Sequence, residues 1–201
     1  MTPRCVIGID EVGRGSLAGP LCVGGCLMDT KAKKPFFRPL SGIRDSKKLS
    51  SKQRLTWFTI LSEASARGEC RWSMAFVSER VIDTRGLSFA LRHAIKTVLQ
   101  KLRARPKTSL VLLDGGIRAP HSFRYQKTII KGDEKEPLIA AASIVAKVSR
   151  DAYMTRLSKR FPLYGFAAHK GYGTKKHYAA LKKHGISKVH RKSFLKKFLI
   201  V

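Results

Sequence analysis

Acidic residues stand where three apolar, strand-like runs of this sequence end. The runs at residues 5–10, 109–113 and 123–131 each lead into one or two of them, which are Asp10, Glu11, Asp114 and Asp133. The chain has only 13 acidic residues against 41 Lys and Arg, so this placement is informative. Ligand-binding and catalytic groups of α/β sheets commonly project from strand ends. We therefore expect an α/β fold that gathers these four carboxylates at one edge of its sheet.

Hydrophobic periodicity predicts the rest of the architecture. Further strand-like runs lie at residues 21–28 and 70–77. Helical patterns occupy residues 51–66, a short piece after Ser78, and residues 87–103, 137–160, 174–184 and 190–198. The order β–β–α–β–α–β–β–α predicts a mixed sheet in one α/β domain over residues 1–201, in which residues 161–201 form a basic helical C-terminal extension.

The net charge limits the class of partner. The formal charge is +28, and a field of that size attracts polyanions and makes their binding salt-dependent. No run approaches the roughly 20 apolar residues of a membrane-spanning helix, and the N-terminus lacks the apolar core and cleavage site of a signal peptide. We expect a cytoplasmic protein with no membrane partner and with free, buried thiols at Cys5, Cys22, Cys26 and Cys70.

A cluster of carboxylates repels itself unless protons or cations neutralise it. Hard oxygen ligands suit Mg²⁺ or Mn²⁺. On a basic protein, two such ions fit phosphodiester hydrolysis, in which one ion activates water and the other stabilises the leaving oxygen. Each acid taken alone is also an ordinary turn or loop residue, but the joint pattern favours a metal site.

The first two acids are subject to a geometric condition. Successive strand residues point to opposite faces of a sheet. Asp10 and Glu11 therefore serve one site only if the strand ends or bends there, or if one of them contributes its backbone carbonyl. Gly13 and Gly15 permit such a bend.

A glycine-rich loop follows these two acids. Gly13, Gly15 and Gly19 have the wrong spacing for a dinucleotide fingerprint, and the Gly-Lys-Ser/Thr of a P-loop is absent. The loop can instead bring backbone N–H groups close to a sugar or phosphate. Arg14, between the first two glycines, is a candidate anion contact.

Five segments together resemble the ribonuclease HII family, in the family's order and over nearly the whole chain. They are residues 10–15 (DEVGRG) followed by 17–20 (LAGP), 45–49 (DSKKL), 112–115 (LLDG), 131–133 (KGD) with 140–151 (AAASIVAKVSRD), and 169–174 (HKGYGT). Ribonuclease HIII lacks an Arg between the two glycines and carries an extra N-terminal domain. Arg14 and the early first strand therefore favour the HII type.

The resemblance implies a ribonuclease H-like fold, which is a mixed five-stranded sheet flanked by helices. It also implies two divalent ions, Mg²⁺ or Mn²⁺, held by Asp10, Glu11, Asp114 and Asp133. The implied reaction is endonucleolytic hydrolysis 5′ to a ribonucleotide, leaving 3′-OH and 5′-phosphate ends. The substrates would be RNA–DNA hybrids and duplex DNA with embedded ribonucleotides, so that the enzyme would serve DNA replication and repair.

The resemblance further implies how the substrate is held. Tyr172 would stack on the deoxyribose beside a ribo-to-deoxy junction, since an aromatic ring is a sequence-tolerant platform. The 2′-OH, by which a protein tells RNA from DNA, would be contacted by Gly13, Arg14 and Gly15. The candidate phosphate contacts, each equally consistent with solvated surface, are Lys47, Lys147 and Lys170.

Two alternatives from other classes stay open. A non-catalytic, basic RNA-binding protein explains the charge but not the clustered acids. An integrase or transposase-type nuclease shares the carboxylate chemistry but needs neither the Gly-Arg-Gly loop nor Tyr172. Residues 193–201 lack the Gln that begins the sliding-clamp peptide of some family members. We therefore expect a monomer that binds nucleic acid without a clear clamp motif.

Overall fold

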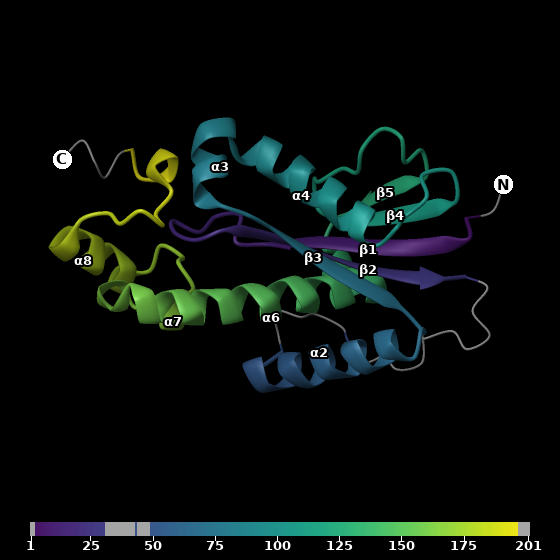
Figure 1. The fold of residues 1–201 in the computed structure, drawn as a ribbon, viewed down its shortest axis with the longest axis horizontal. Helices are drawn as coiled ribbons and strands as arrows, with labels where there is room; N and C mark the ends of the chain where they lie inside the picture. The colour runs from purple at the N-terminus through teal and green to yellow at the C-terminus, as the bar shows by residue number, and fades with distance from the viewer. Residues whose placement is uncertain (1–2, 31–42, 44–48, 197–201) are drawn as a thin grey trace.

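A mixed five-stranded sheet forms the centre of the computed structural model, which describes residues 3–30, 43 and 49–196 (Figure 1). The strand order is β3-β2-β1-β4-β5. β1 pairs antiparallel with β2 and parallel with β4, β2 pairs antiparallel with β3, and β4 pairs parallel with β5. The strands are β1 (Cys5–Val12), β2 (Leu21–Asp29), β3 (Arg71–Val77), β4 (Ser109–Asp114) and β5 (Gln126–Ile129). The predicted α/β class and five-stranded mixed sheet are confirmed.

Helices cover both faces of this sheet (Figure 1). α4 lies on one face, α6 lies on the other, and α2 packs outside α6. The helices are α2 (Ser51–Ala66), α3 (Glu79–Arg85), α4 (Leu87–Lys101), α5 (Gly132–Lys135), α6 (Pro137–Arg160), α7 (Phe166–His169) and α8 (Lys175–His184), with 3-10 turns η1 (Pro162–Tyr164) and η2 (Lys192–Phe194). None of the helices in the described ranges is long and apolar enough to cross a membrane.

Small residues let α6 approach the sheet closely. A Cβ on Gly8 would lie 2.2 Å from the backbone of Leu138, and one on Gly24 would lie 2.2 Å from the carbonyl oxygen of Ala142. Ala140, Ala141 and Ala142 on the facing turns of the helix are buried. Because only small side chains fit this contact, the helix is held directly over β1 and β2, with its later turns above the end of β1.

The C-terminal region packs on the loop between β1 and β2. Leu17 and Ala18 of that loop share a buried core with Met154, Phe166 and Leu181. Ala18 also forms an isolated β-bridge with His190. The loop after the first two acids is thereby fixed by residues more than 130 positions away along the chain.

Several elements differ from the sequence expectation. β5 covers only Gln126–Ile129 of the predicted run 123–131, because β4 offers it partners only over Val111–Asp114. The short helices α5 and α7 and the 3-10 turn η1 were not predicted. In the described part of the predicted helix 190–198, residues 192–194 form the 3-10 turn η2 and residue 196 is helical, while residues 197 and 198 lie outside the described residues. The cysteines are free as predicted, although Cys5 is only half-buried.

Candidate active site

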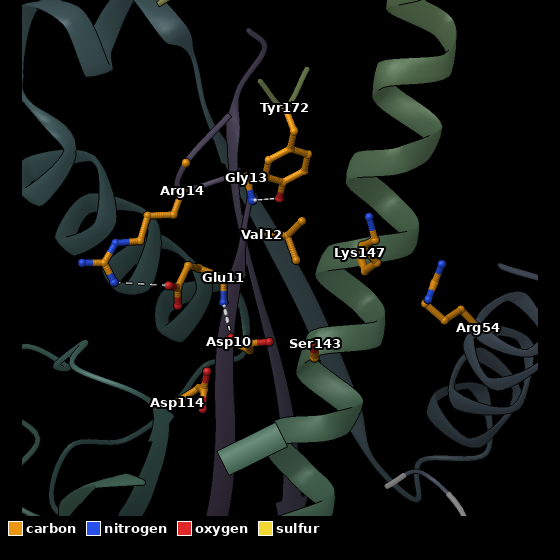
Figure 2. Close-up of a pocket in the computed structure, with 11 residues that line it drawn as sticks. Asp10, Glu11, Val12, Gly13, Arg14, Arg54, Asp114, Ser143, Lys147 and Tyr172 are labelled. Atoms are coloured by element: carbon orange, nitrogen blue, oxygen red, sulfur yellow. Dashed lines mark hydrogen bonds and ion pairs between the residues drawn. The ribbon is translucent and has the colours of Figure 1, made fainter. Parts of the chain in front are cut away.

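A cavity of about 540 Å³ opens at the end of β1, between the β1–β2 loop, α6 and α2 (Figure 2). It gathers three of the four predicted acids with the glycine loop and the predicted aromatic residue. The lining residues are Asp10, Glu11, Val12, Gly13, Arg14, Gly15, Arg54, Asp114, Ser143, Lys147 and Tyr172. Segments far apart in the sequence thus converge on one site.

The strand geometry resolves how adjacent acids serve one cavity. β1 continues through Val12, so Asp10 and Glu11 point to opposite sides of it, Asp10 toward Ser143 of α6 and Glu11 toward Arg14 (Figure 2). The Glu11 N–H donates to Asp10 Oδ1 at 2.8 Å. No bend between the two acids is needed, because both of them line the same cavity.

Burial makes this site electrostatically unfavourable for carboxylates. The pKa of Asp10 is raised to about 7, first by burial and then by the charges of Glu11 and Asp114, while a hydrogen bond with Ser143 opposes the shift. The pKa of Glu11 is also raised, first by burial, with Arg14 opposing and Asp114 adding to the shift. The protein therefore concentrates negative charge where water cannot fully solvate it.

The fourth predicted acid lies beside the cavity and does not line it. Asp133 is 1% exposed, in the first turn of α5. The preceding N–H, that of Gly132, donates to Asp114 Oδ1 at 2.7 Å. A Cβ on Gly132 would meet Ile139 at 2.6 Å, so glycine permits this close packing. The start of α5 thus ties Asp133 to the end of β4.

The donor set fits hard divalent cations. Asp10, Glu11 and Asp114 offer carboxylate oxygens of the kind that Mg²⁺ and Mn²⁺ prefer. The Oε2 atom of Glu11 is buried without a hydrogen-bond partner, which a cation would satisfy. Among the residues that the structure describes, no three acidic, histidine or cysteine side chains form a ready-made metal group. The acids therefore fit the chemistry of the ions but would have to adjust to hold them.

The loop after β1 meets Tyr172 across the cavity. The backbone N–H of Gly13 donates to the Tyr172 hydroxyl at 3.2 Å (Figure 2). Gly13 has φ +87°, which favours glycine, and a Cβ there would also lie 2.1 Å from Arg150 Nε. Arg14 is exposed, and its guanidinium lies 3.6 Å from Glu11 Oε1. Gly15 also lines the cavity, and a Cβ on it would meet no atom within 4 Å.

A buried arginine, missed by the sequence analysis, holds this arrangement. Arg150 of α6 donates to the carbonyls of Pro20 and Lys170 at 2.9 Å and to the Ser16 hydroxyl at 2.8 Å. Its guanidinium lies 5.4 Å from the centre of the Tyr172 ring. It therefore joins the glycine loop to the segment that carries the tyrosine, and its buried charge is compensated by several acceptors.

The predicted lysines fall in different places. Lys147 lines the cavity, and its Nζ donates to Asp151 at 2.9 Å. Lys170 does not line the cavity, and its Nζ donates to the Thr155 hydroxyl at 3.1 Å. Lys47 lies outside the described residues.

Two further polar residues of the cavity were not anticipated. Arg54 comes from α2 and Ser143 from α6. Ser143 lies four residues before Lys147, so both share one face of the helix. That spacing was a usable sequence signal, whereas Arg54 reaches the site only through the packing of α2 on α6.

Known proteins match this chain along nearly its full length. A family model described as Ribonuclease HII matches residues 7–197. The ribonuclease HII of Caldicellulosiruptor bescii is 44% identical over 197 residues, which cover 98% of this chain and 89% of that protein.

Solved structures agree. The ribonuclease H2 from Pyrococcus horikoshii OT3 gives a TM-score of 0.74 at 25% identity, covering 96% of each chain. A chain of the PCNA:RNase HII complex from Archaeoglobus fulgidus gives 0.71 at 29% identity, covering 92% of this chain and 93% of that one. The chain therefore belongs to the ribonuclease HII family, whose members are metal-dependent endoribonucleases acting on RNA–DNA hybrids.

Proposed function

We propose that this enzyme, besides cutting the RNA of hybrids, cuts duplex DNA 5′ to a single embedded ribonucleotide with the help of two divalent ions. The observation that carries the proposal is the shared cavity. It holds buried carboxylates and, within the same wall, a backbone N–H of the glycine loop bonded to the hydroxyl of Tyr172. Chemistry on a phosphate and recognition of a neighbouring sugar can therefore take place side by side.

Asp10, Glu11 and Asp114 would hold the ions, and Asp133 would complete the set from the start of α5. Bound ions of this kind supply an activated water and stabilise the leaving oxygen. The raised pKa of Asp10 supports this role, because a cation would replace the proton that burial favours there. The Ser143 hydrogen bond orients the Asp10 carboxylate while Arg14 faces Glu11.

Gly13, Arg14 and Gly15 would contact the 2′-OH, and Tyr172 would stack on the adjoining deoxyribose. A 2′-OH both donates and accepts hydrogen bonds, so backbone groups at a close-approach glycine can distinguish it from hydrogen. Lys147 would meet a phosphate at the cavity wall, and Lys47 and Lys170 would be further phosphate contacts. The formal charge of +28 supports binding of a long polyanion.

We further propose that the chain acts as a monomeric, single-domain enzyme in the cytoplasm, removing misincorporated ribonucleotides and the RNA of hybrids. Membership of the ribonuclease HII family argues against both alternatives raised from the sequence, the non-catalytic RNA-binding protein and the integrase-type nuclease.

The test combines metal binding with cleavage. Thermal unfolding is followed as Mn²⁺ or Mg²⁺ is added, and cleavage of a hybrid and of a duplex with one ribonucleotide is measured with and without a chelator. Wild type is expected to gain thermal stability with either ion and to cut both substrates only when an ion is present. Asp10→Asn should lose both responses, and Asp29→Asn, at an exposed strand end, should keep both. Undiminished cleavage by Asp10→Asn would contradict the proposed site.

A further inference from the structure

Three histidines lie together behind the segment that carries Tyr172, outside the acidic cavity. The rings of His169 and His177 stack with centroids 4.3 Å apart, and the ring of His190 lies 5.3 Å from that of His177. His177 is 0% and His190 is 2% exposed. Buried ring nitrogens need hydrogen-bond partners, so the partners of these rings determine which nitrogens carry protons.

Those partners fix a direction along the cluster. The Ser187 N–H donates to His190 Nδ1 at 2.9 Å, so this nitrogen carries no proton and the neutral ring is protonated at Nε2. That atom lies 3.1 Å from His177 Nε2, which must then accept. The proton of neutral His177 is therefore on Nδ1, which donates to the carbonyl of Tyr172 at 2.9 Å. Each ring has one allowed tautomer.

The far end of this chain is the backbone of the tyrosine in the cavity. The Tyr172 carbonyl accepts from His177 and also from the Thr174 N–H at 2.8 Å, and the Tyr172 N–H donates to the carbonyl of His169 at 2.9 Å. The Tyr172 hydroxyl meets Gly13. Both ends of the residue are therefore fixed, the backbone by the histidine cluster and the side chain by the glycine loop.

We propose that His177, with His190 behind it, is a positioning residue that sets Tyr172 against Gly13 and thereby determines how well the enzyme recognises a single ribonucleotide. This inference rests on the role of Tyr172 in the proposed function. His177 touches no reacting group; it acts through the tyrosine carbonyl. A shift of that backbone would move the ring and its hydroxyl, because the side chain has few torsions with which to compensate.

The electrostatics of the cluster are consistent with neutral rings. Burial lowers the pKa of His177 and, with His177 and His169 nearby, lowers the pKa of His190 to about 4. Both rings therefore stay in the neutral form that the hydrogen-bond directions require at neutral pH.

The test compares cleavage of a duplex holding one ribonucleotide with cleavage of a full RNA–DNA hybrid. His177→Phe keeps a ring without a donor, and His177→Asn returns a donor near the place of Nδ1. The ratio of interest is kcat/KM for the single-ribonucleotide duplex divided by kcat/KM for the hybrid. We expect His177→Phe to lower this ratio by about tenfold, the scale of one lost buried hydrogen bond. His177→Asn should restore most of the ratio. His93→Phe, at an exposed ring on α4, should leave it unchanged.

A Tyr172→Ala background separates positioning from other effects. If His177 acts through the tyrosine, His177→Phe has no further effect on the ratio in that background. A second tenfold loss there, or an unchanged ratio in the His177→Phe enzyme, would overturn the positioning role. An unchanged ratio in Tyr172→Ala alone would instead overturn the role of Tyr172 in the proposed function.

Nitrogen NMR of the wild-type imidazoles tests the relay even if a variant fails to fold. At pH 7.5 the ring proton is expected on Nδ1 of His177 and on Nε2 of His190. A proton on Nε2 of His177 would break the chain of donors and overturn the inference.

Discussion

The hydroxyl of Tyr172 accepts a hydrogen bond from the backbone N–H of Gly13 at 3.2 Å, across 159 positions of sequence. This contact closes one wall of the cavity that holds the carboxylates. It connects the loop leaving β1 with the segment between α7 and α8. The loop and the tyrosine that we propose to recognise the substrate are therefore held in a fixed relation to the carboxylates that we propose to bind the ions.

Tyr172→Phe is expected to weaken cleavage at a single ribonucleotide while keeping the aromatic platform. The variant loses only the bond to Gly13, worth about 0.5–1.5 kcal/mol, so kcat/KM should fall about three- to tenfold. Steady-state cleavage of the single-ribonucleotide duplex measures this, with Tyr125→Phe, at an exposed tyrosine, as the matched control. Equal kcat/KM values for the two variants would mean that the hydroxyl contact does not contribute to cleavage.

Asp10→Asn is expected to stabilise the metal-free fold while it removes activity. At pH 8 the Asp10 carboxylate is ionised although burial, Glu11 and Asp114 all raise its pKa, so its charge opposes folding. Removing that charge should raise the free energy of unfolding by about 1–3 kcal/mol at pH 8. The gain should shrink as pH falls, since the wild-type side chain then becomes neutral in both states. Urea unfolding with EDTA checks this, and a loss of stability at pH 8 would count against it.

Arg150→Lys is expected to destabilise the protein and to loosen the cavity wall. Lysine keeps the charge but lacks the planar fork that reaches Pro20, Ser16 and Lys170 together. A loss of about 2–4 kcal/mol is expected, because buried acceptors remain unpaired. Arg156→Lys, exposed on the same helix, is the control and should change stability little. Denaturant unfolding measures the free energy of unfolding of both variants. Similar losses in both would refute the role of Arg150 in joining the glycine loop to the Tyr172 segment.

Acid should destabilise the C-terminal region through His190. Its pKa is about 4 in the folded state against an ordinary 6.5, first because of burial and then because of His177 and His169. As pH falls from 7.5 to 5, His190 therefore becomes protonated in the unfolded chain but stays neutral in the folded chain. The free energy of unfolding should drop by about 2 kcal/mol over that interval.

His190→Asn, which does not titrate there, should lose correspondingly less stability, and His93→Gln should behave like wild type. Urea unfolding at both pH values measures the difference. If the free energy of unfolding changes equally with pH in wild type and His190→Asn, another group is responsible.

Much of this structure follows from local sequence patterns, and the remainder depends on partners distant in the chain. The apolar runs before Asp10 and Asp114 predict β1 and β4 because burial on both faces requires continuous apolar residues. The end of β5 could not be predicted, since it depends on how far β4 provides a partner.

The same division holds for the site. The acids and the glycine loop are visible as a motif, whereas Arg54 and Arg150 become relevant only when helices pack. The histidine cluster could not be predicted from the sequence either, because the contact between the ring nitrogens of His177 and His190 forms only in the folded chain.

The most direct measurement is the chemical identity of the ends produced from a DNA duplex that carries one ribonucleotide. Water-mediated, metal-assisted hydrolysis at the carboxylate cavity predicts one cut, on the 5′ side of the ribonucleotide, leaving a 3′-OH on deoxyribose and a 5′-phosphate on the ribonucleotide. The cut should vanish with EDTA and when the single 2′-OH is replaced by hydrogen. A cut on the 3′ side with a 2′,3′-cyclic phosphate would make the 2′-OH itself the nucleophile and would contradict the account.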